Sequence, residues 1–200
     1  AKLQLTYTIT GEGQIKVEQK MTTEKDAKVS EMFRFGMRME LPARFNCVEY
    51  YGRGEVENYV DRKSCADLGI YYQKVSDQYC ETYVRPQESG TKTQIKWMEV
   101  TDDNGVGLQL TSDVKFSASA LPFHWTEMDV YRLNNRQAHS LELKSKAFEG
   151  QRSQGKTWVN VDLKQMGLAC INSWGAWPRE EHLVKPQEYE FKLIFRPTSR

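Results

Sequence analysis

The 200-residue chain carries 28 Lys and Arg residues against 27 Asp and Glu residues, so its formal net charge is +1. A nearly neutral chain has no broad positive field that would attract nucleic acid or an anionic membrane surface, and we expect neither partner. No apolar run approaches the ~20 residues of a membrane-spanning helix. The first residues, Ala1 to Gln4, lack the apolar stretch of a secretory signal. We expect residues 1–200 to form a single domain with a substantial core.

Regular alternation of apolar and polar residues begins at the start of the chain and predicts β-strands. Leu3 to Ile9 alternates, and the segment from Gly11 to Gln14 has the composition of a hairpin turn. The return strand contains Ile15, Val17 and Met21. A second clear alternating run, from Phe33 to Leu41, predicts a half-buried strand that ends at Pro42.

Further short strands follow along the rest of the chain, with Asp102 to Gly105 as a strong turn between two of them. The only helix that the sequence suggests is Arg62 to Ile70. Repeated short strands separated by turns indicate an all-β, antiparallel sandwich or barrel. The expected strands are Phe45–Tyr50, Gln94–Val100, Val106–Leu110, Val114–Ala118, His124–Arg132, Ala138–Lys144, Thr157–Leu163 and Glu188–Phe195.

The sequence offers no recognisable catalytic or metal-binding motif. There is no G-x-S-x-G, no H-E-x-x-H and no glycine-rich phosphate loop, and the carboxylates are scattered over polar faces. His124 and His139 are expected to be ordinary sheet residues. The four cysteines form no C-x-x-C pair, so we expect no zinc site and favour free, buried thiols over a disulfide; they are Cys47, Cys65, Cys80 and Cys170.

Two irregular segments interrupt the alternation and predict shaped loops. The first runs from Tyr50 to Arg62 and combines glycines with charged and amide side chains. These polar groups could bind a polyhydroxyl ligand, or they could form an internal network built on an Asp61–Arg62 or a Glu57–Arg62 pair, and both interpretations remain open.

The second irregular segment runs from Gln165 to Pro178 and contains Trp174 followed by Gly175. An indole in such a loop can present its face to a sugar ring, so Trp174 is the residue that we expect to contact a ligand. Alternatively, Trp174 and Trp177 close one end of the sandwich. The other strand tryptophans, at 97 and 158, are expected to pack within the fold.

Four motifs in one order resemble the C-terminal domain of glycoside hydrolase family 2 β-galactosidases, and the resemblance extends from about Leu3 to about Phe195. They are Gly52-x-Gly54-x-x-Glu57-Asn58-Tyr59-x-Asp61-Arg62, Tyr83 to Gly90, Trp158 to Asp162 with Met166-Gly167, and Asn172-Ser173-Trp174.

The resemblance implies a large antiparallel sandwich of the galactose mutarotase type, packed near the catalytic barrel of the same polypeptide. In that family the barrel carries the two catalytic glutamates, so we expect no catalytic residue here and an inactive isolated fragment that lacks the first strands of its domain. The substrate would be a β-galactoside. No cofactor is expected in this part, although parent enzymes of the family often use Mg and Na in other domains. A bacterial homo-oligomer, cytoplasmic or periplasmic, fits the resemblance.

The resemblance also assigns the site residues. Trp174, with Ser173 and Asn172, would form an indole platform at the mouth of the sugar pocket, and the glycine-rich loop would lie beside the active site through Gly54, Glu57, Asn58, Tyr59, Asp61 and Arg62. The chain departs from the family where it has Ala169-Cys170-Ile171-Asn172 instead of a Gly-Gly-Asp-Asp type of segment, and where Val60 replaces a common proline.

Two rival functions remain open. One is a carbohydrate-binding or adhesion sandwich with no catalytic parent. The other is a mutarotase-type epimerase, which needs a histidine and a carboxylate on one concave face. His124 with Glu127 is the best such pair in the sequence.

Overall fold

The computed structural model describes residues 1–24, 29–80, 83, 88–125, 155–169, 172 and 175–199, and most of these residues are in strands. Single turns of 3-10 helix, η1 (Val75–Gln78) and η4 (Glu180–His182), lie between them. Within the described residues, no helix is long and apolar enough to span a membrane. The expected all-β antiparallel fold is confirmed. The strands are β1 (Lys2–Ile9), β2 (Ile15–Thr22), β3 (Arg34–Pro42), β4 (Cys47–Gly54), β5 (Asp67–Lys74), β6 (Lys92–Thr101), β7 (Gly107–Leu121), β8 (Lys156–Gln165) and β9 (Tyr189–Thr198).

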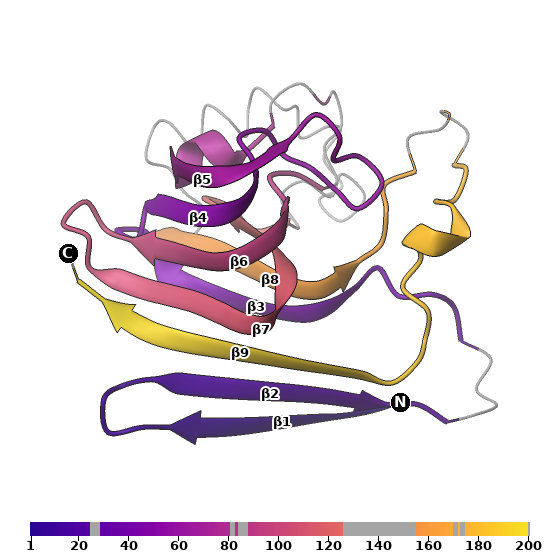
Figure 1. The fold of residues 1–200 in the computed structure, drawn as a ribbon, viewed down its shortest axis with the longest axis horizontal. Helices are drawn as coiled ribbons and strands as arrows, with labels where there is room; N and C mark the ends of the chain where they lie inside the picture. Colours follow the sequence, from indigo (N-terminus) through magenta and orange to yellow (C-terminus); the bar gives the residue numbers. More distant parts are fainter. Residues whose placement is uncertain are drawn as a thin grey trace.

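The strands form one branched sheet in which β7 belongs to two layers (Figure 1). The main path runs β1-β2-β9-β7-β6-β4-β5, and β3 and β8 form a side branch. The first part of β7, residues 107–111, pairs with β9, and its last part, residues 117–121, pairs with β8. Two register shifts between β6 and β7, around Ile95, mark irregular pairing of the kind that bends a strand pair. The sheet thereby folds over on itself along β7.

The core lies between the β3–β8 branch and the main sheet. Phe35 of β3 stacks on Tyr189 of β9 with ring centroids 5.1 Å apart, and Nε2 of Gln19 on β2 donates to the carbonyl of Gly36 at 3.0 Å. Neither contact belongs to a strand ladder, so these elements face each other across the core. The buried apolar cluster draws on both layers and includes Val17, Val48, Ile95, Met98, Leu110, Phe116, Val159, Val161, Phe191 and Leu193.

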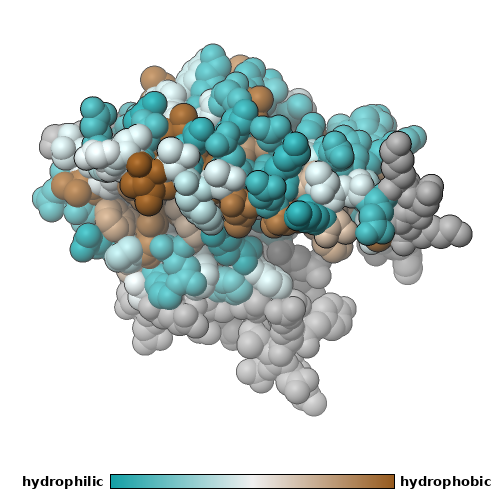
Figure 2. Space-filling view, turned by 90° about the horizontal axis from the view of Figure 1, so that it is seen from below, coloured by the Kyte–Doolittle hydropathy of each residue, from teal (hydrophilic) through white to brown (hydrophobic). Residues whose placement is uncertain are grey.

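The apolar face of β1 continues the core face but is not covered by the described residues. Leu3 and Tyr7 pair with Met21 and Val17, whose side chains are buried. All eight residues of β1 are nevertheless exposed, because the β3–β8 branch lies over β2 and does not extend to β1. Figure 2, a view of the molecule from below, shows apolar side chains scattered among hydrophilic ones on the described surface.

The predicted helix from Arg62 to Ile70 is wrong. Residues 67–74 form β5, the edge strand beside β4, and the side chains of Ile70 and Tyr72 point to solvent. A nine-residue segment containing Gly69 is too short to stabilise a helix by itself, whereas pairing with β4 satisfies its backbone groups. Two further boundaries differ. The strands expected at 106–110 and 114–118 are one strand, β7, and β4 extends to Gly54, into the segment expected to be a loop.

Some expectations fall partly or wholly outside the described residues. His124 and Trp125 are described and are not in a strand, whereas the rest of 124–132 and all of 138–144 lie outside. The Cys47 thiol is buried and the Cys80 thiol is half-buried, but Cys65 is exposed, so the expectation of buried thiols is wrong for Cys65.

Candidate functional site

Asn58 fixes the base of the first loop, which connects β4 to β5. Its side chain is fully buried, and Nδ2 donates to the carbonyls of Arg53 at 3.0 Å and Val56 at 3.1 Å. Its Oδ1 accepts hydrogen bonds from the backbone amide (3.0 Å) and the hydroxyl of Thr93 on β6. These contacts use the full hydrogen-bonding capacity of an asparagine side chain. Asn58 therefore holds the loop on the sheet and has no donor or acceptor left for a ligand.

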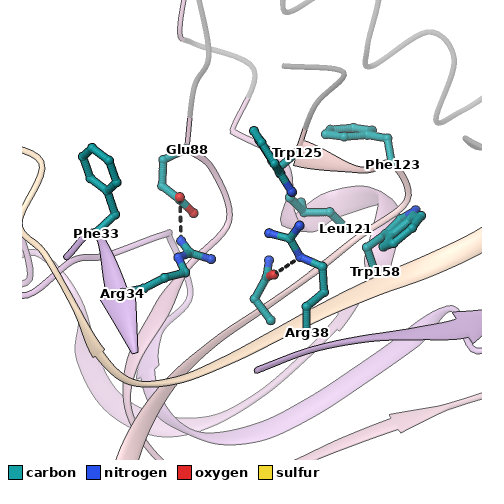
Figure 3. A pocket seen from close by; sticks show the side chains of 9 residues that line it. Phe33, Arg34, Arg38, Glu88, Leu121, Phe123, Trp125 and Trp158 are labelled. Carbon is teal, nitrogen blue, oxygen red and sulfur yellow. Dashed lines mark hydrogen bonds and ion pairs between the residues drawn. The ribbon is translucent and has the colours of Figure 1, made fainter. Parts of the chain in front are cut away.

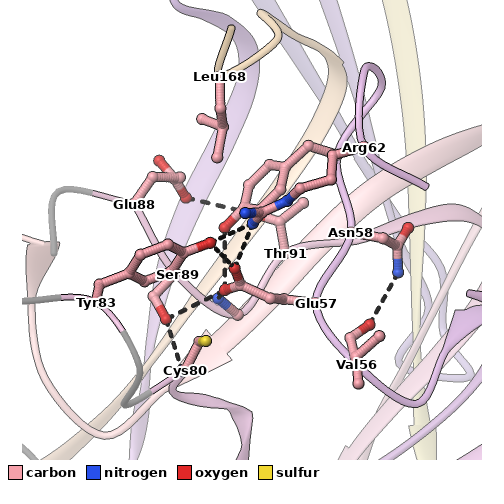
Figure 4. A network of polar contacts seen from close by, with 12 residues as sticks. Val56, Glu57, Asn58, Arg62, Cys80, Tyr83, Glu88, Ser89, Thr91 and Leu168 are labelled. Carbon is pink, nitrogen blue, oxygen red and sulfur yellow. Dashed lines mark hydrogen bonds and ion pairs between the residues drawn. The ribbon is translucent and has the colours of Figure 1, made fainter. Parts of the chain in front are cut away.

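Glu57 is the centre of a buried polar network in the same loop (Figure 4). Its side chain is 8% exposed and pairs with Arg62, whose Nη2 lies 2.6 Å from Oε1. The carboxylate also accepts hydrogen bonds from the hydroxyl of Tyr83, from the hydroxyl of Tyr59 at 3.3 Å and from the backbone amide of Gly90 at 2.8 Å. A buried charge with this many partners is compensated. The internal Glu57–Arg62 network that the sequence left open is therefore present.

Two features keep this network in its observed form. Burial and the Glu57 carboxylate raise the pKa of the Tyr83 and Tyr59 hydroxyls, so both remain protonated donors. Gly90 has φ +78°, and a Cβ there would lie 2.6 Å from the carbonyl oxygen of Gln78. Only glycine adopts this conformation in this space without strain, and it is needed to direct the amide at Glu57.

Asp61 connects the two loops that the sequence singled out. Its Oδ1 accepts the amide of Leu168 at 3.1 Å and its Oδ2 accepts the amide of Ala169 at 2.8 Å, across more than 100 residues of sequence. We call this arrangement the Asp61 clamp. Gly167 packs directly on it, since a Cβ at that position would lie 2.4 Å from Oδ2. Asp61 therefore does not form the Asp61–Arg62 pair considered from the sequence but anchors the start of the second loop.

The second loop leaves β8 at Gln165 and is held by hydrogen bonds before and after Ser173 and Trp174. The amide of Gly167 donates to the carbonyl of His182 at 3.0 Å, and the exposed Asn172 accepts the amide of Ala176 through Oδ1 at 3.4 Å. Trp177 is 57% exposed, so it does not close an end of the sandwich. Ser173 and Trp174 lie outside the described residues, and their expected contacts with a sugar remain predictions.

A groove lies between the β3–β8 branch and this loop (Figure 3). It consists of two hollows, of about 350 and 460 Å³, that share Phe33, Arg34, Glu88 and Trp125. We call it the β3–β8 groove. The first hollow is completed by Arg38, Leu121, Phe123, Trp158 and Asn160, and the second runs along Gln165, Met166, Gly167 and Leu168 to the Asp61 clamp.

Arg34 forms one charged cluster of the groove. Its Nη2 lies 2.7 Å from Oε2 of Glu88, and its Nη1 lies 3.6 Å from Oδ2 of Asp162. The Asp162 side chain is almost completely enclosed. Burial raises the pKa of Asp162 to about 6, while the neighbouring Arg34 guanidinium opposes that shift.

Arg38 forms the second polar cluster, four residues further along β3. Its Nε donates to Oδ1 of Asn160 at 2.6 Å, and its Nη1 lies 3.0 Å from Nε2 of His124. The guanidinium carbon lies 5.5 Å from the centre of the Trp125 ring, within range of a cation–π contact. Among the described residues, Arg38 has no carboxylate within ion-pair distance.

Sequence reasoning missed the groove residues. The alternating run from Phe33 to Leu41 places Arg34 and Arg38 on the polar face of the predicted strand, but the pattern does not show what that face meets. The available signal was that Arg34, Gly36 and Arg38 share that face, with a glycine between two long cations. In the proposed epimerase pair, His124 contacts Arg38 and packs edge-on against Trp158, with ring centroids 4.4 Å apart. Glu127 lies outside the described residues.

Comparison with known proteins identifies the family. The sequence model of the family described as "Beta galactosidase small chain" matches residues 1–195. A β-galactosidase from Priestia megaterium is 32% identical over 88% of this chain, one from Halalkalibacterium halodurans is 30% identical over 92%, and one from Lactobacillus delbrueckii subsp. bulgaricus is 29% identical over 98%. The chain spans only 15–18% of the length of these relatives. The fold, the motifs and the match over 195 residues show that this chain belongs to the β-galactosidase small-chain family.

Proposed function

We propose that this chain is the C-terminal sandwich of a retaining β-galactosidase, which hydrolyses terminal β-D-galactose from β-galactosides. The catalytic glutamates belong to a barrel elsewhere in the parent protein, and this part contributes shape and binding energy to the sugar site. The family match and the β-galactosidase relatives support the parent activity. The proposal includes a fold of the galactose mutarotase type and a packing contact with the catalytic barrel.

The observation that carries the proposed role is the Asp61 clamp. It fixes the backbone at Leu168 and Ala169, only five residues before Trp174. An indole presented from a tethered segment loses little freedom when a sugar stacks on it, which favours correct placement of the glycosidic bond. In this role Trp174 stacks on the sugar that occupies the leaving-group side of the bond, with Asn172 and Ser173 beside it.

The test is the Trp174→Ala variant of the complete protein, assayed for lactose hydrolysis and for galactosyl transfer to a sugar acceptor. An aromatic contact contributes roughly 0.5–1.5 kcal/mol, so KM for lactose should rise about twofold to tenfold and transfer should fall. The midpoint of thermal unfolding should not change. Trp177→Ala, three residues away and exposed, is the matched control and should have wild-type kinetics. Wild-type KM and transfer in Trp174→Ala would reject the role.

A second experiment tests whether the catalytic residues lie outside this chain. The 200-residue chain should not release the chromophore from a nitrophenyl β-galactoside, whereas the complete protein should. Turnover by the chain alone would place a catalytic residue within it and contradict the proposal.

A further inference from the structure

We propose that the β3–β8 groove is a second carbohydrate site, which takes one neutral pyranose ring. The proposal rests on the proposed function only in choosing galactosides as the ligands to test. The first hollow, at about 350 Å³, falls within the range of roughly 300–1,000 Å³ typical of small-molecule sites. Its mouth continues into the second hollow and ends at the loop that leads to Trp174.

Aromatic side chains form the walls of the groove. Trp125 and Phe123 stand on one side, with Trp158 beside them, and Phe33, which is 75% exposed, stands at the rim (Figure 3). Flat aromatic faces pack well against the C–H faces of a pyranose ring.

Hydrogen-bond donors and acceptors converge on the same space. Arg38 is held in place by Asn160 through Nε and by His124 through Nη1, and its Nη2 has no protein partner among the described residues. Asn160 is itself fixed, because its Nδ2 donates to the hydroxyl of Ser119 at 3.0 Å. Arg38 thus presents a preorganised donor pair, and the Glu88 carboxylate on the opposite wall supplies acceptors.

The charges of the groove favour a neutral ligand over an anion. Arg34 and Arg38 are balanced by Glu88 and Asp162, two positive groups against two negative groups. An anion would gain from Arg38 but would be repelled by Glu88, which lines both hollows. A polyhydroxyl ring needs both donors and acceptors and carries no charge, so it matches all of these groups.

The experiment measures galactoside binding to the complete protein in a Trp174→Ala background, which weakens the first proposed site, and the Trp125 signal then reports on the groove alone. The probe is methyl thio-β-D-galactoside, which is not cleaved. Its binding is measured by calorimetry and by the NMR shift of the Trp125 indole N–H. The probe should shift the Trp125 resonance. Trp125→Ala and Arg38→Gln should each weaken binding about tenfold, while Tyr72→Ala, an exposed aromatic on β5 away from the groove, should not change it.

Galacturonate serves as the anionic comparison and should bind at least tenfold more weakly than galactose. Three results would overturn the proposal: no shift of the Trp125 resonance, binding that Trp125→Ala and the milder Trp125→Phe both leave unchanged, or a preference for galacturonate. The two proposals fail separately. Wild-type lactose kinetics in Trp174→Ala would reject the first site but would not bear on the groove. A Trp125 resonance that does not shift with the probe would reject the groove but would not bear on the proposed hydrolysis.

Discussion

Replacing Asp61 by Asn removes one of the two carboxylate oxygens that hold the second loop. The remaining amide oxygen can accept the N–H of either Leu168 or Ala169, but the new NH₂ group then faces the other backbone N–H, and two donors meet. The shape of the side chain is preserved, so the variant changes hydrogen bonding and charge while leaving packing almost unaltered.

The size of the effect follows from the two bonds. A hydrogen bond to a charged group contributes about 1.5–3 kcal/mol, and Asp61→Asn loses one such bond and weakens the other. Because Asp61 is only partly buried, we expect the closed state of the loop to lose about 2 kcal/mol. At 1.4 kcal/mol per factor of ten, this corresponds to roughly a 30-fold increase in the open population.

Amide hydrogen exchange measures this opening directly. The amides of Leu168 and Ala169 should exchange about 30 times faster in Asp61→Asn, while amides in the centre of β8, such as that of Val161, should change much less. Asp67→Asn, an exposed carboxylate at the start of β5, is the control and should leave all three rates unchanged. Wild-type exchange at Leu168 and Ala169 in Asp61→Asn would show that the clamp does not hold the loop.

The remaining predictions concern stability in urea. Glu57→Gln should lower the free energy of unfolding by about 3 kcal/mol, because Arg62 and two phenols lose a buried charged acceptor, whereas exposed Glu55→Gln should change it little. Gly167→Ala should cost about 1–3 kcal/mol, since its Cβ would collide with Asp61. A raised pKa means that folded Asp162 binds its proton more tightly than the unfolded chain does. The stabilising contribution of Asp162 is therefore complete below about pH 4 and is lost as the pH rises through about 6. Through this group the free energy of unfolding should fall by on the order of 3 kcal/mol between pH 4 and 8, and Asp162→Asn should abolish that decrease. An equal pH slope in both proteins, or a Gly167→Ala stability equal to wild type, would contradict these arguments.

Period-two alternation predicted most strands because one face of each strand meets the core. It failed at β5, where Ile70 and Tyr72 are apolar but face solvent on an edge strand, so the pattern carried no inside-outside signal. It also divided β7 at Thr111 to Asp113. Those polar residues lie where β7 leaves β9 and joins β8, a change of partner that only the tertiary fold determines.

The candidate site was predictable only in part for a similar reason. The Glu57–Arg62 pair lies within one loop, so local spacing suggested it, together with the Asp61–Arg62 pair that does not form. The partner of Asp61 is a pair of backbone amides far along the chain, and a backbone amide leaves no mark in a sequence. The contact of Arg38 with Trp125 likewise depends on how the β3–β8 branch folds over.

Strand β8 explains why the groove and the core occupy neighbouring positions. Val159 and Val161 point into the core and are fully buried, whereas the alternate residues Trp158, Asn160 and Asp162 line or support the groove. The groove floor is therefore the outer face of a strand whose inner face is fixed by packing. Because a close-packed interior tolerates little movement, Asn160 and Asp162 give Arg38 and Arg34 fixed partners on the strand, and Glu88 and His124 add contacts from outside the strands. The polar residues of this strand are thus positioned by its valines, and a ligand that binds in the groove would meet groups already set in place.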